Sequence, residues 1–86
     1  MFTYRGTADC VLADGTSMPV SVRLTSEPGL LDGIVGTATA PNFPLPYLNQ
    51  PEVTLRLPDG KARKFMVKNV AGFRTLELAS NGDWLP

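Results

Sequence analysis

The chain contains no histidine, and it has a single cysteine among its 86 residues. Without histidine it lacks the commonest general base and the commonest metal ligand of proteins. Cys10 has no second cysteine with which to form a disulfide or to share a metal ion. We therefore expect a protein without catalytic activity, cofactor or bound metal, located in the reducing environment of the cytoplasm.

An excess of charge of one sign and long hydrophobic runs are missing as well. Eight lysines and arginines balance eight aspartates and glutamates, so the formal net charge is zero, whereas dedicated nucleic-acid binders usually carry a basic excess. No apolar run approaches the about 18 residues of a membrane-spanning helix. Residues 1–5 also lack the apolar core of a signal peptide. These absences indicate a protein that is not bound to a membrane.

What the chain does contain is a turn that occurs twice, as Asp14-Gly15 and as Asp59-Gly60, each with a leucine two residues before the aspartate. The flanking residues alternate between apolar and polar, which is typical of strands with one buried face. Because directly paired residues share a face, a three-residue loop is needed to keep apolar positions paired across each turn. The pattern therefore predicts two hairpins, each with a type I turn followed by a glycine in the left-handed conformation.

The same alternation predicts the register of the hairpins. In the first hairpin Leu12 is expected to pair with Thr16. The residues expected to face the core of the second hairpin are Val53, Leu55, Leu57, Phe65 and Val67. A third turn near residues 71–72 is expected to pair Val67 with Leu76 through a loop of two or four residues.

The strands form two groups that a proline-rich segment separates. Residues 1–40 and 52–80 each read as a three-stranded meander, and residues 81–86 form a tail. Four prolines keep residues 41–51 out of a central ladder, so this strap is predicted to be an irregular crossover. Residues 34–39 read as a glycine-interrupted strand that leaves a free edge. We predict a single all-β domain, either a small six-stranded antiparallel barrel or a compact sandwich.

A basic cluster lies in the second meander. Six of the eight cationic residues fall between positions 56 and 74, namely Arg56, Lys61, Arg63, Lys64, Lys68 and Arg74. Such a hairpin can follow nucleic-acid phosphates, but the predicted register also places Lys64 and Lys68 diagonal to Glu52 and Glu77, which would neutralise them within the sheet. Arg63 is expected to point to the core side, with its charged end at the barrel rim.

A second cationic feature is the pair Arg5 and Arg23. The predicted register places these residues directly opposite each other on the outer face, among threonines and serines. Like charges in this position are destabilising. Either Asp32 or Glu27 neutralises the pair, or the two guanidinium groups and the surrounding hydroxyls hold a carboxylate or a phosphate.

Candidate partner-binding residues are aromatic or apolar. Phe43 and Tyr47 of the strap either fold over an open end of the core or form an exposed surface that recruits a partner. Val70 and Phe73 are expected to share the outer face beside the third turn, and Trp84 either caps the core or contacts a partner.

These features favour a non-catalytic binding module. We expect it to associate with another protein or with a second copy of itself, through these apolar residues or by strand addition at the free edge of residues 34–39. The alternative is nucleic-acid or anion binding by the basic residues of 56–74, together with Arg5 and Arg23.

Overall fold

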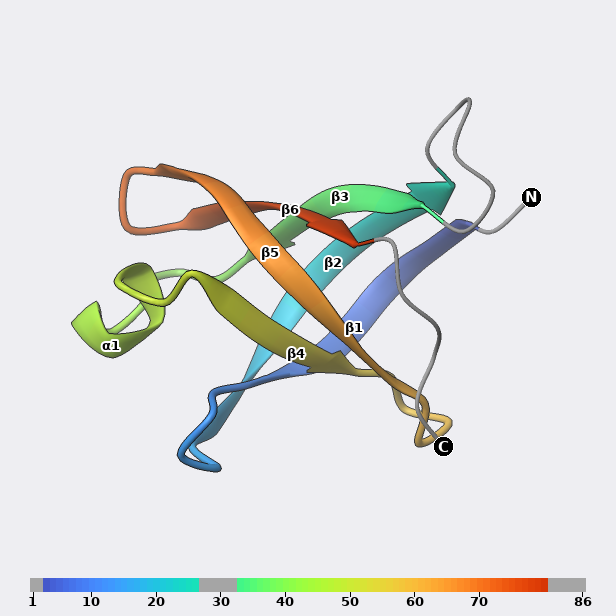
Figure 1. Cartoon of the computed structure of the whole chain (residues 1–86), viewed down its shortest axis with the longest axis horizontal. Helices are drawn as coiled ribbons and strands as arrows, with labels where there is room; N and C mark the ends of the chain where they lie inside the picture. The colour runs from blue at the N-terminus through green and yellow to red at the C-terminus, as the bar shows by residue number, and fades with distance from the viewer. Residues whose placement is uncertain (1–2, 27–32, 81–86) are drawn as a thin grey trace.

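The computed structural model describes residues 3–26 and 33–80 as a closed antiparallel barrel. Its strands are β1 (Thr3–Val11), β2 (Ser17–Ser26), β3 (Ile34–Thr39), β4 (Glu52–Arg56), β5 (Ala62–Ala71) and β6 (Thr75–Ser80). They pair in the order β1-β2-β3-β6-β5-β4, and β4 pairs back with β1 (Figure 1). The all-β prediction is confirmed, and of its two alternatives the chain adopts the barrel.

The first two hairpins have the predicted bulged loops. The Leu12 N–H donates to the Thr16 carbonyl oxygen at 2.8 Å, which closes the first loop around three residues. Gly15 and Gly60 end the two loops with φ values of 90° and 94°. A side chain at either position would be strained in this left-handed conformation, which explains why both turns end in glycine.

The third hairpin differs from the predicted register. Val67 pairs with Leu78 instead of Leu76, and Leu76 pairs with Val70. The register shifts between Val67 and Asn69, so one extra residue is accommodated on β5. This β-bulge exchanges the inward-facing and outward-facing positions in the remaining part of β5.

Two further corrections follow from the bulge. Because Ala71 pairs with Thr75, the loop between β5 and β6 has three residues rather than two or four. Val70 is half-buried and packs against the core, so it does not share the outer face with Phe73. Phe73 itself lies in the loop, with 58 % of its surface exposed.

The predicted free edge of β3 is absent from the barrel. β3 pairs along its whole length with β2 on one side and with β6 on the other. On the other side of the barrel, the pairing of β4 with β1 extends only over Asp9–Val11 of β1. Within the described strands, the first part of β1 therefore has no β4 neighbour. There the Tyr4 hydroxyl donates to the Thr7 carbonyl oxygen at 2.7 Å and satisfies one edge acceptor.

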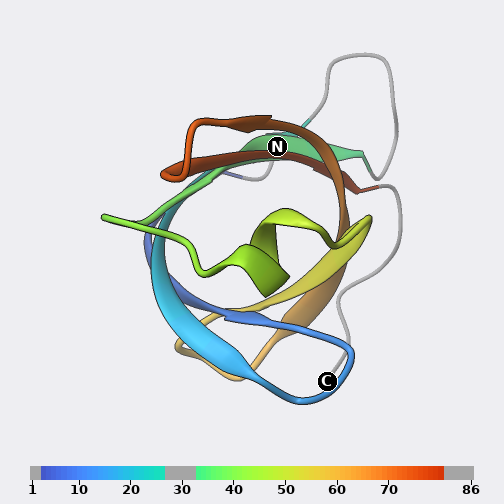
Figure 2. The ribbon, with the colours of Figure 1, turned by 90° about the vertical axis from the view of Figure 1, so that its left-hand side faces the viewer.

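The proline-rich strap closes one end of the barrel. It contains one helical turn, α1 (Leu45–Leu48), which the predicted irregular crossover did not include. Figure 2 shows this turn lying across the barrel opening. Phe43 and Tyr47 are buried against the core, with ring centroids 6.2 Å apart. Of the two alternatives for these aromatics, the structure shows the one in which they fold over an end of the core.

Candidate functional site

The outer face of β1, β2 and β3 carries two rows of polar side chains. Odd-numbered residues point outward on these strands because the even-numbered ones fill the core. The paired registers align Arg5 with Arg23 and Arg23 with Thr37, which makes the first row. The second row is aligned in the same way and consists of Thr7, Ser21 and Thr39.

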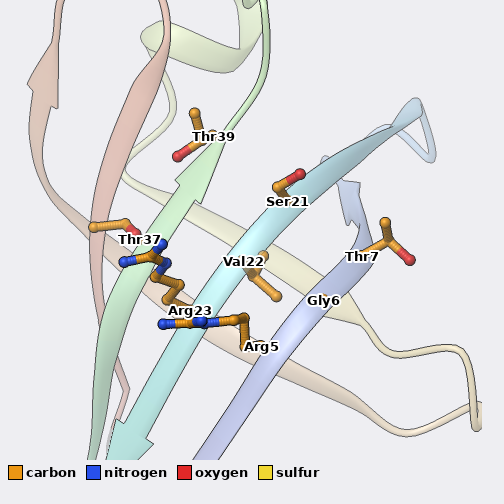
Figure 3. Close-up of a pocket in the computed structure, with 8 residues that line it drawn as sticks. All are labelled: Arg5, Gly6, Thr7, Ser21, Val22, Arg23, Thr37 and Thr39. Atoms are coloured by element: carbon orange, nitrogen blue, oxygen red, sulfur yellow. The ribbon is translucent and has the colours of Figure 1, made fainter.

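The two rows line a hollow on the barrel surface. Its volume is about 550 Å³, and its lining consists of the six residues of the two rows together with Gly6 and Val22. Figure 3 shows both arginine side chains extended toward β3 and Thr37, with Ser21, Thr7 and Thr39 on the other side of the hollow. Because Arg5, Arg23 and Ser21 are exposed, a solute can reach the hollow from solvent.

No ion pair within the described residues neutralises Arg5 or Arg23. The carboxylate in line with their row is Glu77, which lies opposite Thr37 on β6. Its Oε2 atom accepts a hydrogen bond from the Asn69 amide at 3.2 Å, on the far side of β6 from the arginines. Asp32 and Glu27, the carboxylates that the sequence suggested for this role, lie outside the described residues.

Gly36 allows β3 to lie close to β2 at the arginine row. A Cβ atom at this position would overlap the carbonyl oxygen of Arg23 and come within 2.9 Å of the Leu24 Cδ2 atom. Thr37 is the next residue, and it lies directly opposite Arg23. The glycine therefore permits the close backbone approach of β3 to β2 beside this row.

The basic residues of 56–74 do not extend this site. β5 is three strands away from β2 in either direction around the barrel, so Lys64 and Lys68 face away from the hollow. Lys64 lies opposite Thr54 and diagonal to Glu52, as predicted. On the other neighbour, the predicted register places Lys64 and Lys68 diagonal to Glu77, but the bulge brings Asn69 directly opposite Glu77 instead.

Arg63 is buried inside the barrel, instead of reaching solvent at the rim. Only 4 % of its surface is exposed, and its Nε atom donates to the Ser80 Oγ atom at 3.0 Å. Every buried side-chain nitrogen and oxygen of the described residues has a hydrogen-bond partner. Arg63 is thus held as a structural residue of the barrel interior, whereas Arg56 and Lys61 are exposed.

The candidate partner-binding residues do not form one exposed surface in the described part of the chain, because several of them are buried. Phe43 and Tyr47 are buried, and Trp84 lies outside the described residues. Phe73 remains exposed, and its carbonyl oxygen accepts a hydrogen bond from the Phe43 N–H at 2.7 Å. Leu45 of α1 was not among the predicted residues, although 64 % of its surface is exposed.

The sequence pattern predicted the arginine pair and the threonines and serines beside it on β1 and β2, but it missed the β3 residues of the hollow. Thr37 and Thr39 were not proposed as site residues, because the register between β2 and β3 had not been derived. Their signal is the Thr-x-Thr spacing in a strand, which places two hydroxyls on one face.

Among the described residues, those that line the hollow offer two guanidinium groups and four hydroxyl groups, which can donate hydrogen bonds to a solute. Within residues 3–26 and 33–80, no group of three or more His, Cys, Asp or Glu side chains is placed to hold a metal ion. Cys10 lies in the core, where burial raises the pKa of its thiol to about 11. In the same part of the chain, no helix is long and apolar enough to cross a membrane.

No family model, no curated protein and no solved structure matches the chain.

Proposed function

We propose that this chain is a non-catalytic binding module whose β1–β2–β3 hollow captures an anionic group of its ligand. The observation that carries the proposal is the direct pairing of Arg5 with Arg23, with no ion pair to either among the described residues. Two like charges directly opposite each other destabilise a sheet. An anion between them turns this repulsion into two charge-assisted interactions.

The chemistry of the row suits an oxyanion. Each guanidinium presents a planar fork of N–H donors that matches the oxygens of a carboxylate or a phosphate. Thr37 adds a hydroxyl donor beside Arg23. Phosphate and carboxylate are therefore the two groups that this row binds best.

Calorimetric titration with inorganic phosphate tests the proposal. The ionic strength is held at about 0.15 M, because salt screens exposed charges. We expect binding by the wild type and its loss in Arg5→Gln and Arg23→Gln. Lys64→Gln is the matched control, since it removes the same charge from the opposite side of the barrel. Equal phosphate binding by all four proteins, or no binding by the wild type, contradicts the proposal.

A second candidate function is association through the capped end of the barrel. Leu45 and Phe73 are large apolar side chains that are more than half exposed, and the hydrogen bond between Phe43 and Phe73 joins the strap to the third hairpin. Exposed apolar residues of this kind serve as anchors in protein interfaces. A second copy of the chain or another protein would cover them.

Size-exclusion chromatography with light scattering tests the self-association version of this candidate. The expected result is a mass that increases with concentration and falls to the monomer value in the double variant Leu45→Gln/Phe73→Gln. A monomer at every concentration argues against a second copy. Nucleic-acid binding by residues 56–74 stays a separate prediction, which the salt dependence of DNA or RNA binding checks.

A further inference from the structure

The chemistry of the two rows points to a more specific ligand. We infer that the hollow takes a phosphate monoester carried on a polyhydroxylated group, such as a sugar phosphate. The phosphate lies on the arginine row, and the hydroxyl-bearing part lies on the row of Thr7, Ser21 and Thr39. This inference rests on the proposed anion binding and adds the identity of the group that carries the charge.

The arginine row selects the monoester. A carboxylate offers two oxygens, which a single guanidinium fork can bind. A phosphate monoester offers three terminal oxygens and a charge of about −1.5 to −2 at pH 7, so it can engage Arg5, Arg23 and the Thr37 hydroxyl together. A phosphodiester has one charge and two free oxygens, which leaves one arginine without a full partner. The row therefore favours the end of a phosphorylated small molecule over a nucleic-acid backbone.

The hydroxyl row selects what the phosphate is attached to. It lies two residues away from the arginine row on each of the three strands, a distance of about 6.6 Å. Each of its three hydroxyls both donates and accepts hydrogen bonds, as sugar hydroxyls also do. Among the described residues that line the hollow, none is an aromatic side chain on which a nucleobase could stack. A sugar is thus a better match than a base.

The size of the hollow agrees with a ligand larger than a bare anion. Its volume of about 550 Å³ falls within the range of about 300–1,000 Å³ that small-molecule sites occupy. The six row residues come from three adjacent strands of a closed barrel, so the hollow is carried by a hydrogen-bonded framework. A rigid framework of this kind holds binding groups at fixed positions.

The test compares four probes by calorimetric titration at constant ionic strength. These are ribose 5-phosphate, methyl phosphate, dimethyl phosphate and free ribose. We expect ribose 5-phosphate to bind about tenfold more tightly than methyl phosphate, because two or three neutral hydrogen bonds contribute about that factor. Dimethyl phosphate and ribose are expected to bind at least about tenfold more weakly than methyl phosphate.

Variants of the hydroxyl row separate this inference from the proposed function. Ser21→Ala/Thr39→Val should remove the tenfold advantage of ribose 5-phosphate while methyl phosphate binds as before. Thr25→Val is the matched control, since Thr25 is exposed on β2 outside the hollow. Circular dichroism confirms that each variant is folded.

The outcomes are distinct. If both monoesters bind the wild type equally, or if dimethyl phosphate binds best, the inference is overturned and the proposed anion site remains. If neither monoester binds, the proposed function fails together with the inference. An advantage of ribose 5-phosphate that survives Ser21→Ala/Thr39→Val also overturns the assignment of the hydroxyl row.

Discussion

Replacing Arg23 by glutamine should stabilise the free protein and at the same time abolish its response to phosphate. Arg23 lies directly opposite Arg5, and both side chains are exposed. Two unit charges about 5 Å apart in water repel each other by about 0.8 kcal/mol, and physiological salt reduces this value. We therefore expect Arg23→Gln to raise the free energy of unfolding by about 0.3–0.8 kcal/mol in phosphate-free buffer.

Phosphate should reverse the order of stability. At a concentration ten times its dissociation constant, a ligand that binds only the folded state adds about 1.4 kcal/mol to the free energy of unfolding. The wild type gains this increment and becomes more stable than Arg23→Gln, which gains nothing. For a domain of this size, the increment corresponds to a rise in Tm of about 6–11 °C. A reversal of the order of the two unfolding free energies on adding phosphate is what we expect if an anion relieves the repulsion between Arg5 and Arg23.

The assay is urea unfolding followed by far-ultraviolet circular dichroism, with chloride replaced by phosphate at constant ionic strength. Lys64→Gln serves as the control, because Lys64 faces Thr54 rather than another cation. This control should behave like the wild type in both buffers. The reasoning is refuted if Arg23→Gln is less stable than the wild type without phosphate, or if phosphate stabilises both proteins equally.

Three further predictions concern the framework of the site. Gly36→Ala should lower the free energy of unfolding by about 2 kcal/mol or more, because the added methyl group overlaps the Arg23 carbonyl oxygen; urea unfolding measures this, and an unchanged midpoint would mean that β3 moves away freely. At pH 8 the buried Cys10 thiol, with its pKa raised to about 11, should react with iodoacetamide about a hundredfold more slowly in the native protein than in urea; equal rates would show that the thiol is accessible. The Thr16 N–H donates to the Asp14 carboxylate at 2.8 Å and thereby lowers the pKa of that carboxyl. The stability that Asp14 adds is therefore present at neutral pH and is lost as the pH falls through the lowered pKa. Asp14→Ala should approach the wild type in stability at acid pH, and a constant difference in unfolding free energy from pH 7 to pH 2 would contradict this.

The parts of the fold that could be predicted from the sequence are those that depend on local pattern. A period of two along each strand and a glycine after Asp14 or Asp59 are enough to determine a hairpin register, because the turn and the buried face constrain the same residues. The opposition of Arg5 and Arg23 followed from this register, and the structure confirms it.

The third hairpin was predicted wrongly because its alternation is interrupted. Lys68 and Asn69 are two consecutive polar residues between Val67 and Val70, and the structure accommodates them by a bulge. A strict period of two cannot represent an extra residue, so Val70, which follows the bulge on β5, was assigned to the outer face. Two adjacent polar residues inside an alternating strand are the signal that could have indicated this bulge.

Barrel closure depends on pairs that are distant in sequence. β3 pairs with β6, and β1 with β4, over separations that no turn motif encodes. Without the β3–β6 pair, β3 appeared to have a free edge. Thr37 and Thr39 had no predicted neighbours for a different reason, because the turn between β2 and β3 did not predict their register. Arg63 was expected at the rim because its hydrogen-bond partner Ser80, at the far end of β6, could not be predicted from the local pattern.

The most direct test of the anion site is an NMR titration of the isotopically labelled chain with inorganic phosphate at constant ionic strength. The account predicts that the largest shifts occur at the Nε–H groups of Arg5 and Arg23 and at the backbone amide of Thr37. It also predicts that these shifts disappear in Arg23→Gln and persist in Lys64→Gln. An absence of shifts at these groups, or shifts confined to residues 56–74, would contradict it.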